Sequence, residues 1–157
     1  MITNHGSAIR YEHQILGLNS RLDSLQAAIL NVKLKHLDAW HEARRQAASR
    51  YNRLFEGAPV GIPSEASTVR HIYHQYTLRV PNRDGVAKHL AARRIPHAIY
   101  YPIPLHQQAA FRTLGRVAGG VPHTETAARE VLSLPMHTEL TEEQQQVIAS
   151  EVRTALT

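Results

Sequence analysis

Two apolar series with helical spacing run through the first third of the chain. The first series predicts a helix with one buried face, formed by Leu22, Leu25, Ile29 and Val32. A five-residue step then breaks the phase before Leu37, so we expect a bend or a helix-to-helix junction within residues 33–36. The second series continues to residue 54, and glycines and prolines at 57–63 end the helical region.

The pattern then changes to shorter elements. Residues 72–80 alternate between apolar and polar side chains and contain many β-formers, which is typical of a strand. The rest predicts a helix at 84–94, a second strand at 97–101, one or two helical turns at 107–114, a helix at 124–132 and a short extended piece at 133–135. Thr141 and Gln144 form a capping box that opens a final helix. This order predicts an α/β (α+β) fold, in which helices cover a small, mostly antiparallel sheet.

The start of the first helix contains a candidate anion site. Ser20 and Asp23 form a variant of the capping box, so we expect the helix to begin close to Ser20. Asn19 and Arg21 flank this cap and, with the free N–H groups of the first turn, could bind a phosphate or a carboxylate. Taken alone, the residue types favour the plainer alternative of an ordinary capped helix whose Arg is solvated.

Composition and charge narrow the function classes. The chain has 157 residues, enough for one domain with a core, and no Cys, which excludes disulfides and a thiolate nucleophile. No apolar run is long enough to span a membrane, and the first residues lack the apolar core of a signal peptide. We therefore expect a cytoplasmic protein without a membrane partner. The net charge of +5 comes with 18 Lys and Arg, of which only three are Lys, and this surplus of Arg suits anionic ligands.

Eleven His residues raise the question of a metal site, but their spacing does not suit one. His71 and His74 lie three apart on a predicted strand, so their side chains point to opposite faces, and no HExxH motif occurs. Glycine-rich phosphate loops are absent as well. The three lysines, Lys33, Lys35 and Lys88, lie among polar residues of predicted helices, which favours a solvated face over a Schiff-base amine. We expect neither a metal site nor a catalytic lysine.

The segment HAIYYPIPLH, residues 97–106, offers different chemistry. Tyr100 and Tyr101 stand at the end of the predicted second strand and are followed by alternating prolines and a His. Such a rigid loop of phenol and imidazole groups could contact a sugar or a nucleotide. An equally good interpretation is a proline turn that closes the core beneath two ordinary interface tyrosines.

Five stretches carry a resemblance to a known family. They are Asn4-His5-Gly6, GLNSRLDSLQAAIL at 17–30 with its continuation to residue 54, YHQYTLRV at 73–80, YYPIPLHQQAAF at 100–111 and VLSLPMHTEL at 131–140. In this order they resemble the pyridoxal-phosphate-dependent nucleotide-sugar aminotransferases of the DegT/StrS type, across nearly the whole chain. YPIPL and LSLPMH are closest to members that aminate a UDP-linked 3-keto uronic acid for surface polysaccharides, although that subgroup tends to carry His where Tyr100 stands.

The resemblance implies a place within a larger fold. Residues 1–19 would be an irregular lead-in, and residues 20–157 would form the small C-terminal domain of a fold type I aminotransferase. The helical region at about 20–56 would cross to the partner subunit of a homodimer. The complete enzyme would transfer an amino group from an amino acid, with glutamate the expected donor, to a keto-sugar nucleotide such as a UDP-sugar.

The resemblance also implies roles for four residues. Asn19 would bind the phosphate of pyridoxal phosphate across the dimer, while Arg21, Tyr100 and Tyr101 would bind the sugar substrate. In the family, the Schiff-base Lys and most cofactor contacts precede the Asn-His-Gly element, in a large domain that is absent here.

Three expectations follow from that absence. The chain alone should be inactive, should bind no pyridoxal phosphate, and should self-associate through uncovered apolar surface. The alternative from another class is a non-catalytic basic module that binds nucleic acid or a nucleotide sugar. Its Arg residues are spread along the chain and no nucleic-acid motif occurs, so we expect no nucleic-acid partner.

Overall fold

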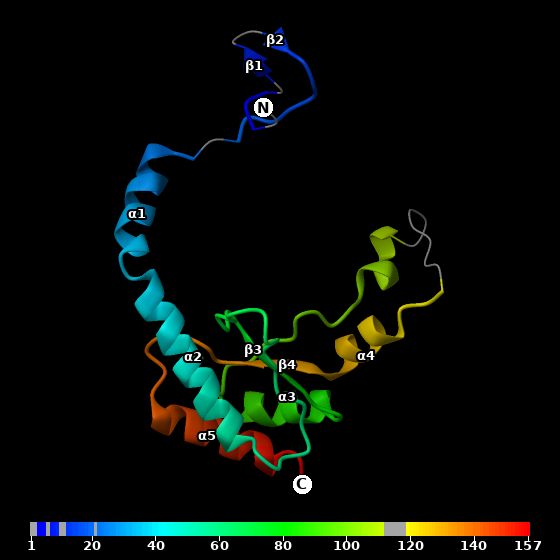
Figure 1. Cartoon of the computed structure of the whole chain (residues 1–157). Coiled ribbons are helices and arrows are strands. Elements are labelled where there is room, and N and C mark those ends of the chain that lie inside the picture. The colour runs from blue at the N-terminus through cyan, green and yellow to red at the C-terminus, as the bar shows by residue number, and fades with distance from the viewer. Residues whose placement is uncertain (1–2, 6, 10–11, 21, 112–118) are drawn as a thin grey trace. The chain divides into compact units, whose positions relative to one another are not determined.

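The computed structural model describes residues 3–5, 7–9, 12–20, 22–111 and 119–157 (Figure 1). The elements follow in the order β1 (Ser7–Ile9), β2 (Glu12–His13), α1 (Ser24–Leu34), α2 (Leu37–Leu54), β3 (Tyr76–Arg79), α3 (Arg83–Ala92), η1 (Leu105–Gln107), η2 (Ala109–Phe111), α4 (Pro122–Glu130), β4 (Val131–Leu134) and α5 (Glu142–Thr154). The chain divides into two compact units, Met1–Asp38 and Ala39–Thr157, and each is described by itself. Within the described ranges, no helix is long and apolar enough to cross a membrane.

The first unit holds the short antiparallel pair β1–β2 and the helix α1. The expected start of this helix, close to Ser20, is wrong, because α1 begins at Ser24 with Asp23 as its N-cap. The Asp23 carboxylate accepts a 2.8 Å hydrogen bond from the backbone N–H of Leu25. Ser20 is held outside the helix, since its N–H donates to the carbonyl oxygen of Thr3 at 3.0 Å.

The prediction of a buried face on α1 is also wrong. Its four apolar residues are 54% to 71% exposed, and α1 contains no buried residue; they are Leu22 just before the helix and Leu25, Ile29 and Val32 within it. Helical spacing shows that a face is apolar, but burial also needs a surface that packs against it. The described residues of the first unit supply no such surface for α1.

The junction between the two helices is confirmed. α1 ends at Leu34 and α2 begins at Leu37, within the stretch where the phase of the apolar pattern breaks. α2 buries Ala47, Ala48 and Tyr51 and ends at Leu54. Gly57 follows with a φ of +71°, a conformation that glycine adopts without the steric cost of a side chain.

The second unit is built on the antiparallel pair β3–β4, with Tyr76 opposite Leu134 at one end. Isolated bridges extend the pairing on both sides, joining Gly61 to β3 and Ala98 to β4. The strand predicted at 72–80 is shorter, because Tyr73 has a φ of +46° and turns the backbone before β3 begins. The strand predicted at 97–101 is reduced to the single bridge at Ala98.

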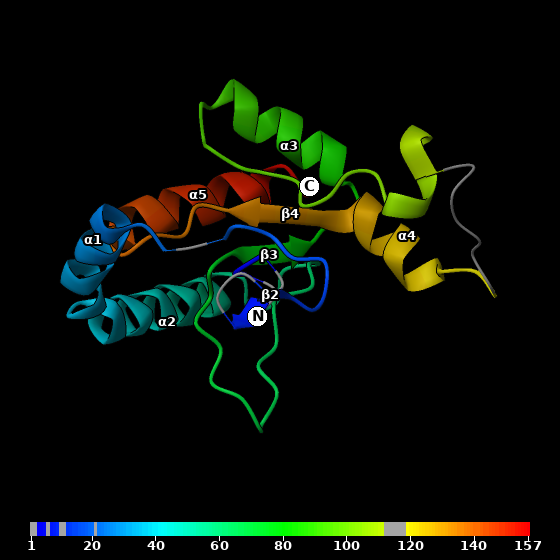
Figure 2. The ribbon, with the colours of Figure 1, turned by 90° about the horizontal axis from the view of Figure 1, so that it is seen from above.

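Helices cover one face of this sheet, as the α/β (α+β) prediction requires. α3 and α5 lie along that face with α2 beside α5 (Figures 1 and 2). The side chains that the sheet contributes to the core are fully or almost fully buried; they are Tyr76, Leu78, Leu132 and Leu134. The capping box of α5 is confirmed, since Gln144 N–H donates to Thr141 Oγ1 and Thr141 N–H donates to Gln144 Oε1.

The opposite face of the sheet is polar. Side chains alternate along a strand, so Thr77 and Ser133 point away from the core, and their hydroxyls lie 2.8 Å apart. On the same face, Arg79 Nη2 pairs with Glu130 Oε2 at 2.7 Å. The helices that build the core therefore lie on the other face, although Ser133 on this polar face is itself buried.

Candidate functional site

In the first unit, the structure brings two of the resembling stretches together. Asn4 of the Asn-His-Gly element forms an antiparallel bridge with Asn19. His5 N–H donates to the carbonyl oxygen of Leu18 at 2.9 Å, and Ser20 bonds back to Thr3. The backbone of Asn19 is thus fixed from both sides, while the residue itself is exposed. Sequence analysis had treated the two stretches separately, because nothing in their spacing signals the pairing.

His13, which sequence analysis did not single out, contacts the same segment through its ring. His13 Nδ1 lies 2.9 Å from the carbonyl oxygen of His5 and 3.0 Å from Ser7 Oγ. Since a carbonyl oxygen only accepts, Nδ1 carries the proton and donates to His5. His13 therefore ties β2 to Ser7 and to the backbone of His5, and it is a structural residue. Nothing in the six-residue spacing of Ser7 and His13 would have indicated the contact.

The start of α1 is a poorer anion site than the sequence predicted. The Asp23 carboxylate takes up a first-turn N–H and places a negative charge at the positive end of the helix. Asn19 lies four residues before this cap, outside the helix. Its contribution to an anion site therefore rests on its own amide donors rather than on the helix dipole. Arg21, the predicted sugar ligand, lies outside the described residues.

In the second unit, Tyr100 and Tyr101 are both exposed at the predicted loop. Tyr100 is 46% exposed and Tyr101 75%, and their ring centroids are 5.8 Å apart in an edge-to-face arrangement. Both rings line a cavity of about 480 Å³ between this loop and α4, together with Ile103, Leu105 and Ala128 among others. The outer end of the loop is tied to α4 by His106 Nε2, 3.1 Å from Glu125 Oε1.

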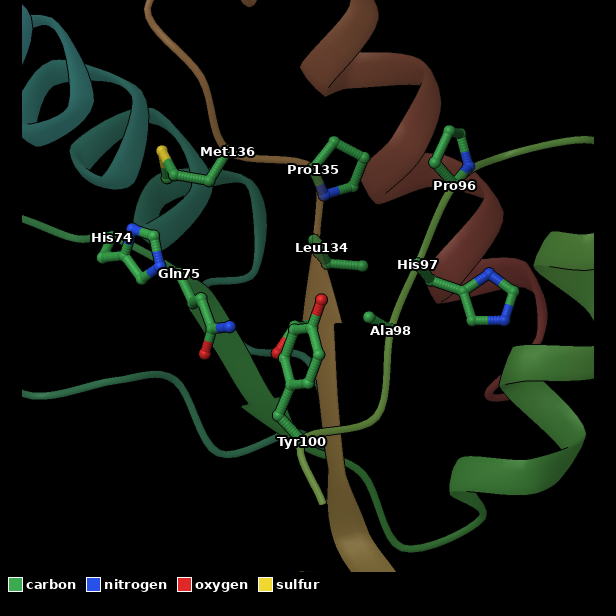
Figure 3. A pocket seen from close by; sticks show the side chains of 10 residues that line it. His74, Gln75, Pro96, His97, Ala98, Tyr100, Leu134, Pro135 and Met136 are labelled. Atoms are coloured by element: carbon green, nitrogen blue, oxygen red, sulfur yellow. The ribbon is translucent and has the colours of Figure 1, made fainter. Parts of the chain in front are cut away.

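Tyr100 also lines a second cavity, of about 370 Å³, on the polar face of the sheet (Figure 3). Three resembling segments converge on it. YHQYTLRV contributes His74 and Gln75, YYPIPLHQQAAF contributes Tyr100, and VLSLPMHTEL contributes residues 133–136, while residues 96–98 complete the lining. Sequence analysis identified Tyr100 but missed His74 and Gln75, which it assigned to a strand. The signal that could have found them was the resemblance of their own stretch.

The wall formed by residues 134–136 is held from the core side. Tyr51 Oη donates to the carbonyl oxygen of Pro135 at 3.2 Å. Arg50 Nη2 donates to the carbonyl oxygen of Leu140 at 3.3 Å, and Arg50 Nε donates to Gln145 Oε1 at 2.6 Å. Gln145 is fully buried and donates in turn to the carbonyl oxygen of Ala47 at 2.8 Å. These bonds fix the segment after β4 to α2 and α5.

The buried tyrosines of the core are unsuited to acid–base chemistry. Burial raises the pKa of Tyr51 and that of Tyr76 well above the ordinary value for a phenol. Tyr76 Oη donates to Asn52 Oδ1 at 2.7 Å, so both phenols act as neutral donors. All three lysines are exposed, on α1, directly after it, and on α3, and none lines either cavity. The two cavities can therefore bind a ligand but contain no amine for a Schiff base.

Comparison with known proteins shows which family this chain resembles in sequence. Residues 1–153 match the model of the DegT/DnrJ/EryC1/StrS aminotransferase family. A pleiotropic regulatory protein from Geobacillus stearothermophilus is 48% identical over 155 residues, which cover 97% of this chain and 42% of that protein. A UDP-N-acetyl-3-dehydro-α-D-glucosamine 3-aminotransferase from Acidithiobacillus ferrooxidans is 43% identical over 155 residues, covering 99% of this chain and 42% of the enzyme.

A solved structure is similar as well. The crystal structure of DesV from S. venezuelae matches with a TM-score of 0.89 and 37% identity, covering 98% of this chain and 42% of DesV. The chain thus spans less than half the length of the relatives that it matches. Sequence and fold agree over nearly all of its residues, and the chain belongs to the DegT/DnrJ/EryC1/StrS aminotransferase family.

Proposed function

We propose that this chain forms the C-terminal part of a pyridoxal-phosphate-dependent aminotransferase that acts on a keto-sugar nucleotide. The amino group comes from an amino acid, with glutamate the expected donor, and the enzyme works as a homodimer. The observation that supports this most is the convergence of three family stretches, with Tyr100 among them, on one cavity. A relative named for a UDP-linked 3-keto sugar favours a substrate of that class.

The residues of this chain fit one end of the cofactor. Pyridoxal phosphate, when bound, supplies the aldehyde that accepts the amino group and passes it on. Asn19 is exposed on a fixed backbone and carries two amide donors, which suit a phosphate oxygen of the cofactor held by the partner subunit. The three exposed lysines offer no amine placed to hold the aldehyde. Asn19 therefore positions the phosphate, and the chemistry belongs to residues outside this chain.

Tyr100 and Tyr101 suit the binding of the sugar substrate. Tyr100 lines both cavities, and Tyr101 lines the one beside α4. An exposed phenol offers a flat apolar ring and a hydroxyl that can donate or accept a hydrogen bond. We assign them, with Arg21, to the sugar of the nucleotide. Their role is to orient the keto carbon and exclude water around it, rather than to move a proton.

The proposal is tested in a full-length enzyme. The coding DNA upstream of Met1 should contain an in-frame segment with the cofactor lysine, and the protein made from both parts should aminate a keto-sugar nucleotide. In that protein, Asn19→Ala should raise the dissociation constant for pyridoxal phosphate about tenfold or more, since it removes a hydrogen bond to a charged group. The cofactor's absorbance during dialysis measures this loss.

Asn82→Ala is the matched control. Asn82 is another exposed Asn, it precedes α3 in the second unit, and its side chain makes no capping hydrogen bond there. Its replacement should leave cofactor retention unchanged. Equal retention by the Asn19 variant and the wild type would remove the role of Asn19.

A further inference from the structure

The loop of residues 99–105 carries the two exposed tyrosines and is held at both of its ends. Before the loop, Ala98 exchanges two backbone hydrogen bonds with β4, at 3.0 and 2.8 Å. After the loop, His106 Nε2 and Gln107 Nε2 lie 3.1 and 3.3 Å from the same oxygen, Glu125 Oε1 of α4. Both views show this end of the loop beside α4 (Figures 1 and 2).

Packing contributes little to holding the loop between these two ends. Of residues 100–105, all of which the structure describes, only Pro104 is buried, and Tyr101 and Leu105 are 75% and 72% exposed. A cavity of about 480 Å³ separates the loop from α4 and the start of β4. The two prolines of the loop restrict its backbone, so a shift at His106 is passed back to Tyr101. The polar contact with α4 therefore sets where the tyrosines lie.

α4 offers a fixed acceptor for this contact. The helix passes into β4 without an intervening loop, and the carbonyl oxygen of Glu130 accepts a 2.8 Å hydrogen bond from the N–H of Val80. Ala128 of α4 is buried as well. Glu125 lies in the first turn, where the helix dipole favours a carboxylate. The sheet therefore fixes the position of Glu125, and Glu125 fixes that of His106.

The contact between His106 and Glu125 has a defined direction. A carboxylate oxygen only accepts, so Nε2 of His106 carries the proton and donates it. Among the salt bridges of the described residues, His106 is the partner of Glu125, and the two side chains are 22% and 39% exposed. A phenylalanine at position 106 would keep a ring and lose this donor. A glutamine there would keep an N–H donor at a similar distance from the backbone.

We propose that His106 is a positioning residue for sugar binding, which acts through Glu125 to hold the loop where Tyr100 and Tyr101 meet the substrate. Without this contact the loop populates other conformations, and only the fraction with the tyrosines in place binds, so the apparent affinity falls by that fraction. His106 itself lines neither cavity. The effect on sugar binding rests on the proposed function, whereas the contact lies wholly within this chain.

The first experiment measures the order of the loop in this chain, by the ¹⁵N heteronuclear NOE of the backbone amides of Tyr101, Ile103 and Leu105. His106→Phe should lower these values, because the loop loses its outer attachment. His106→Gln should keep them close to those of the wild type. Glu125→Ala should lower them as well, and the double variant with His106→Phe should be no lower than Glu125→Ala alone, since both changes remove one contact.

The second experiment uses the full-length enzyme. His106→Phe should raise the KM for the keto-sugar nucleotide about three- to tenfold, the range expected for a partly exposed hydrogen bond. It should leave kcat and the KM for the amino donor nearly unchanged, because it removes only binding of the sugar. His106→Gln should restore the KM. A general loss of structure would instead lower kcat and change both Michaelis constants.

His89→Phe is the matched control. His89 Nε2 lies 2.6 Å from Glu151 Oε2 and joins α3 to α5, so the same substitution removes a His–Glu contact from the helical layer. It should leave the loop amides and the KM for the sugar nucleotide unchanged. Retained amide dispersion in each variant shows that it is folded.

Several outcomes would overturn the positioning role. Unchanged NOE values in His106→Phe would show that the loop does not depend on this contact. An equal rise in the KM for the sugar with His89→Phe, a rise in both Michaelis constants, or no rescue by His106→Gln would assign His106 a general structural role. A wild-type full-length enzyme that aminates no keto-sugar nucleotide removes the proposed function itself, whereas wild-type activity with an unchanged KM in His106→Phe removes only the role of His106.

Discussion

α1 and α2 are consecutive helices, and both carry repeated apolar residues, yet only α2 buries them. Ala47, Ala48 and Tyr51 of α2 are at most 1% exposed, whereas Leu25 and Ile29 of α1 are 71% and 54% exposed. The ring of Tyr51 packs 4.8 Å from that of Tyr76 of β3, centroid to centroid. The buried helix uses two alanines and a tyrosine, while the exposed helix uses large aliphatic residues.

The difference teaches that apolar character and burial are separate properties. α2 is buried because a sheet and α5 supply complementary surfaces, to which Arg50 and Gln145 add hydrogen bonds. α1 is the more apolar of the two helices, but the described residues of its own unit bury none of its side chains. Large contiguous apolar patches on a surface mark interaction sites. α1 is therefore the part of this chain best suited to binding another protein surface, in agreement with the proposed homodimer.

The largest expected effect is a difference in the free energy of unfolding between a variant of the core and a variant of α1. Leu78→Ala in β3 should lower the free energy of unfolding by about 2–5 kcal/mol, because Leu78 is fully buried and its loss leaves a cavity. Leu25→Ala on α1 should change it by about 0.5 kcal/mol or less, since an exposed side chain is removed. Urea unfolding followed by circular dichroism measures both. Both are measured at a protein concentration where the chain is monomeric, and similar losses there would show that α1 packs within the chain itself.

The second prediction concerns association. The isolated chain should self-associate through α1, and Leu25→Lys combined with Ile29→Lys should raise the dissociation constant about a hundredfold, because two large apolar contacts are lost. Sedimentation velocity over a range of concentrations measures this. Val147→Lys is the control, since Val147 is a similarly exposed apolar residue on α5. A wild-type chain that stays monomeric at every concentration contradicts the prediction.

The smallest expected effect is a pH dependence of the stability that the contact between Arg45 of α2 and Glu65 contributes. The Arg45 guanidinium, 2.8 Å from Glu65, and the N–H of His71 hold the pKa of Glu65 below its usual range. A carboxyl with a lowered folded-state pKa stabilises the fold above its unfolded pKa of about 4.3, and this contribution is lost as the pH falls through the folded value.

The amide resonance of His71 reports that loss. As the pH falls, the resonance should move in the wild type at a pH below the ordinary range for a glutamate, because the hydrogen bond to Glu65 is lost there. Glu65→Gln should abolish this transition, while Glu56→Gln, elsewhere in the second unit, should retain it. Persistence of the transition in Glu65→Gln would assign it to another group.

Local chemistry accounts for what the sequence alone could predict. The capping box of Thr141 and Gln144, the junction between residues 34 and 37 and the antiparallel sheet of the second unit depend on neighbouring residues and on periodicity, both of which can be read along the chain. Asn19, Tyr100 and Tyr101 came from the resemblance, and their roles stay proposals.

Only the tertiary structure decided where those local patterns lead. It assigned the cap of α1 to Asp23, because pairing with Thr3 holds Ser20 in an extended conformation. It brought Gln75 and residues 133–136 beside Tyr100, although these segments are more than twenty residues apart in the sequence. It left the apolar face of α1 exposed. Such outcomes depend on which distant surfaces meet, and a hydrophobic pattern states that a face needs a partner without naming the partner.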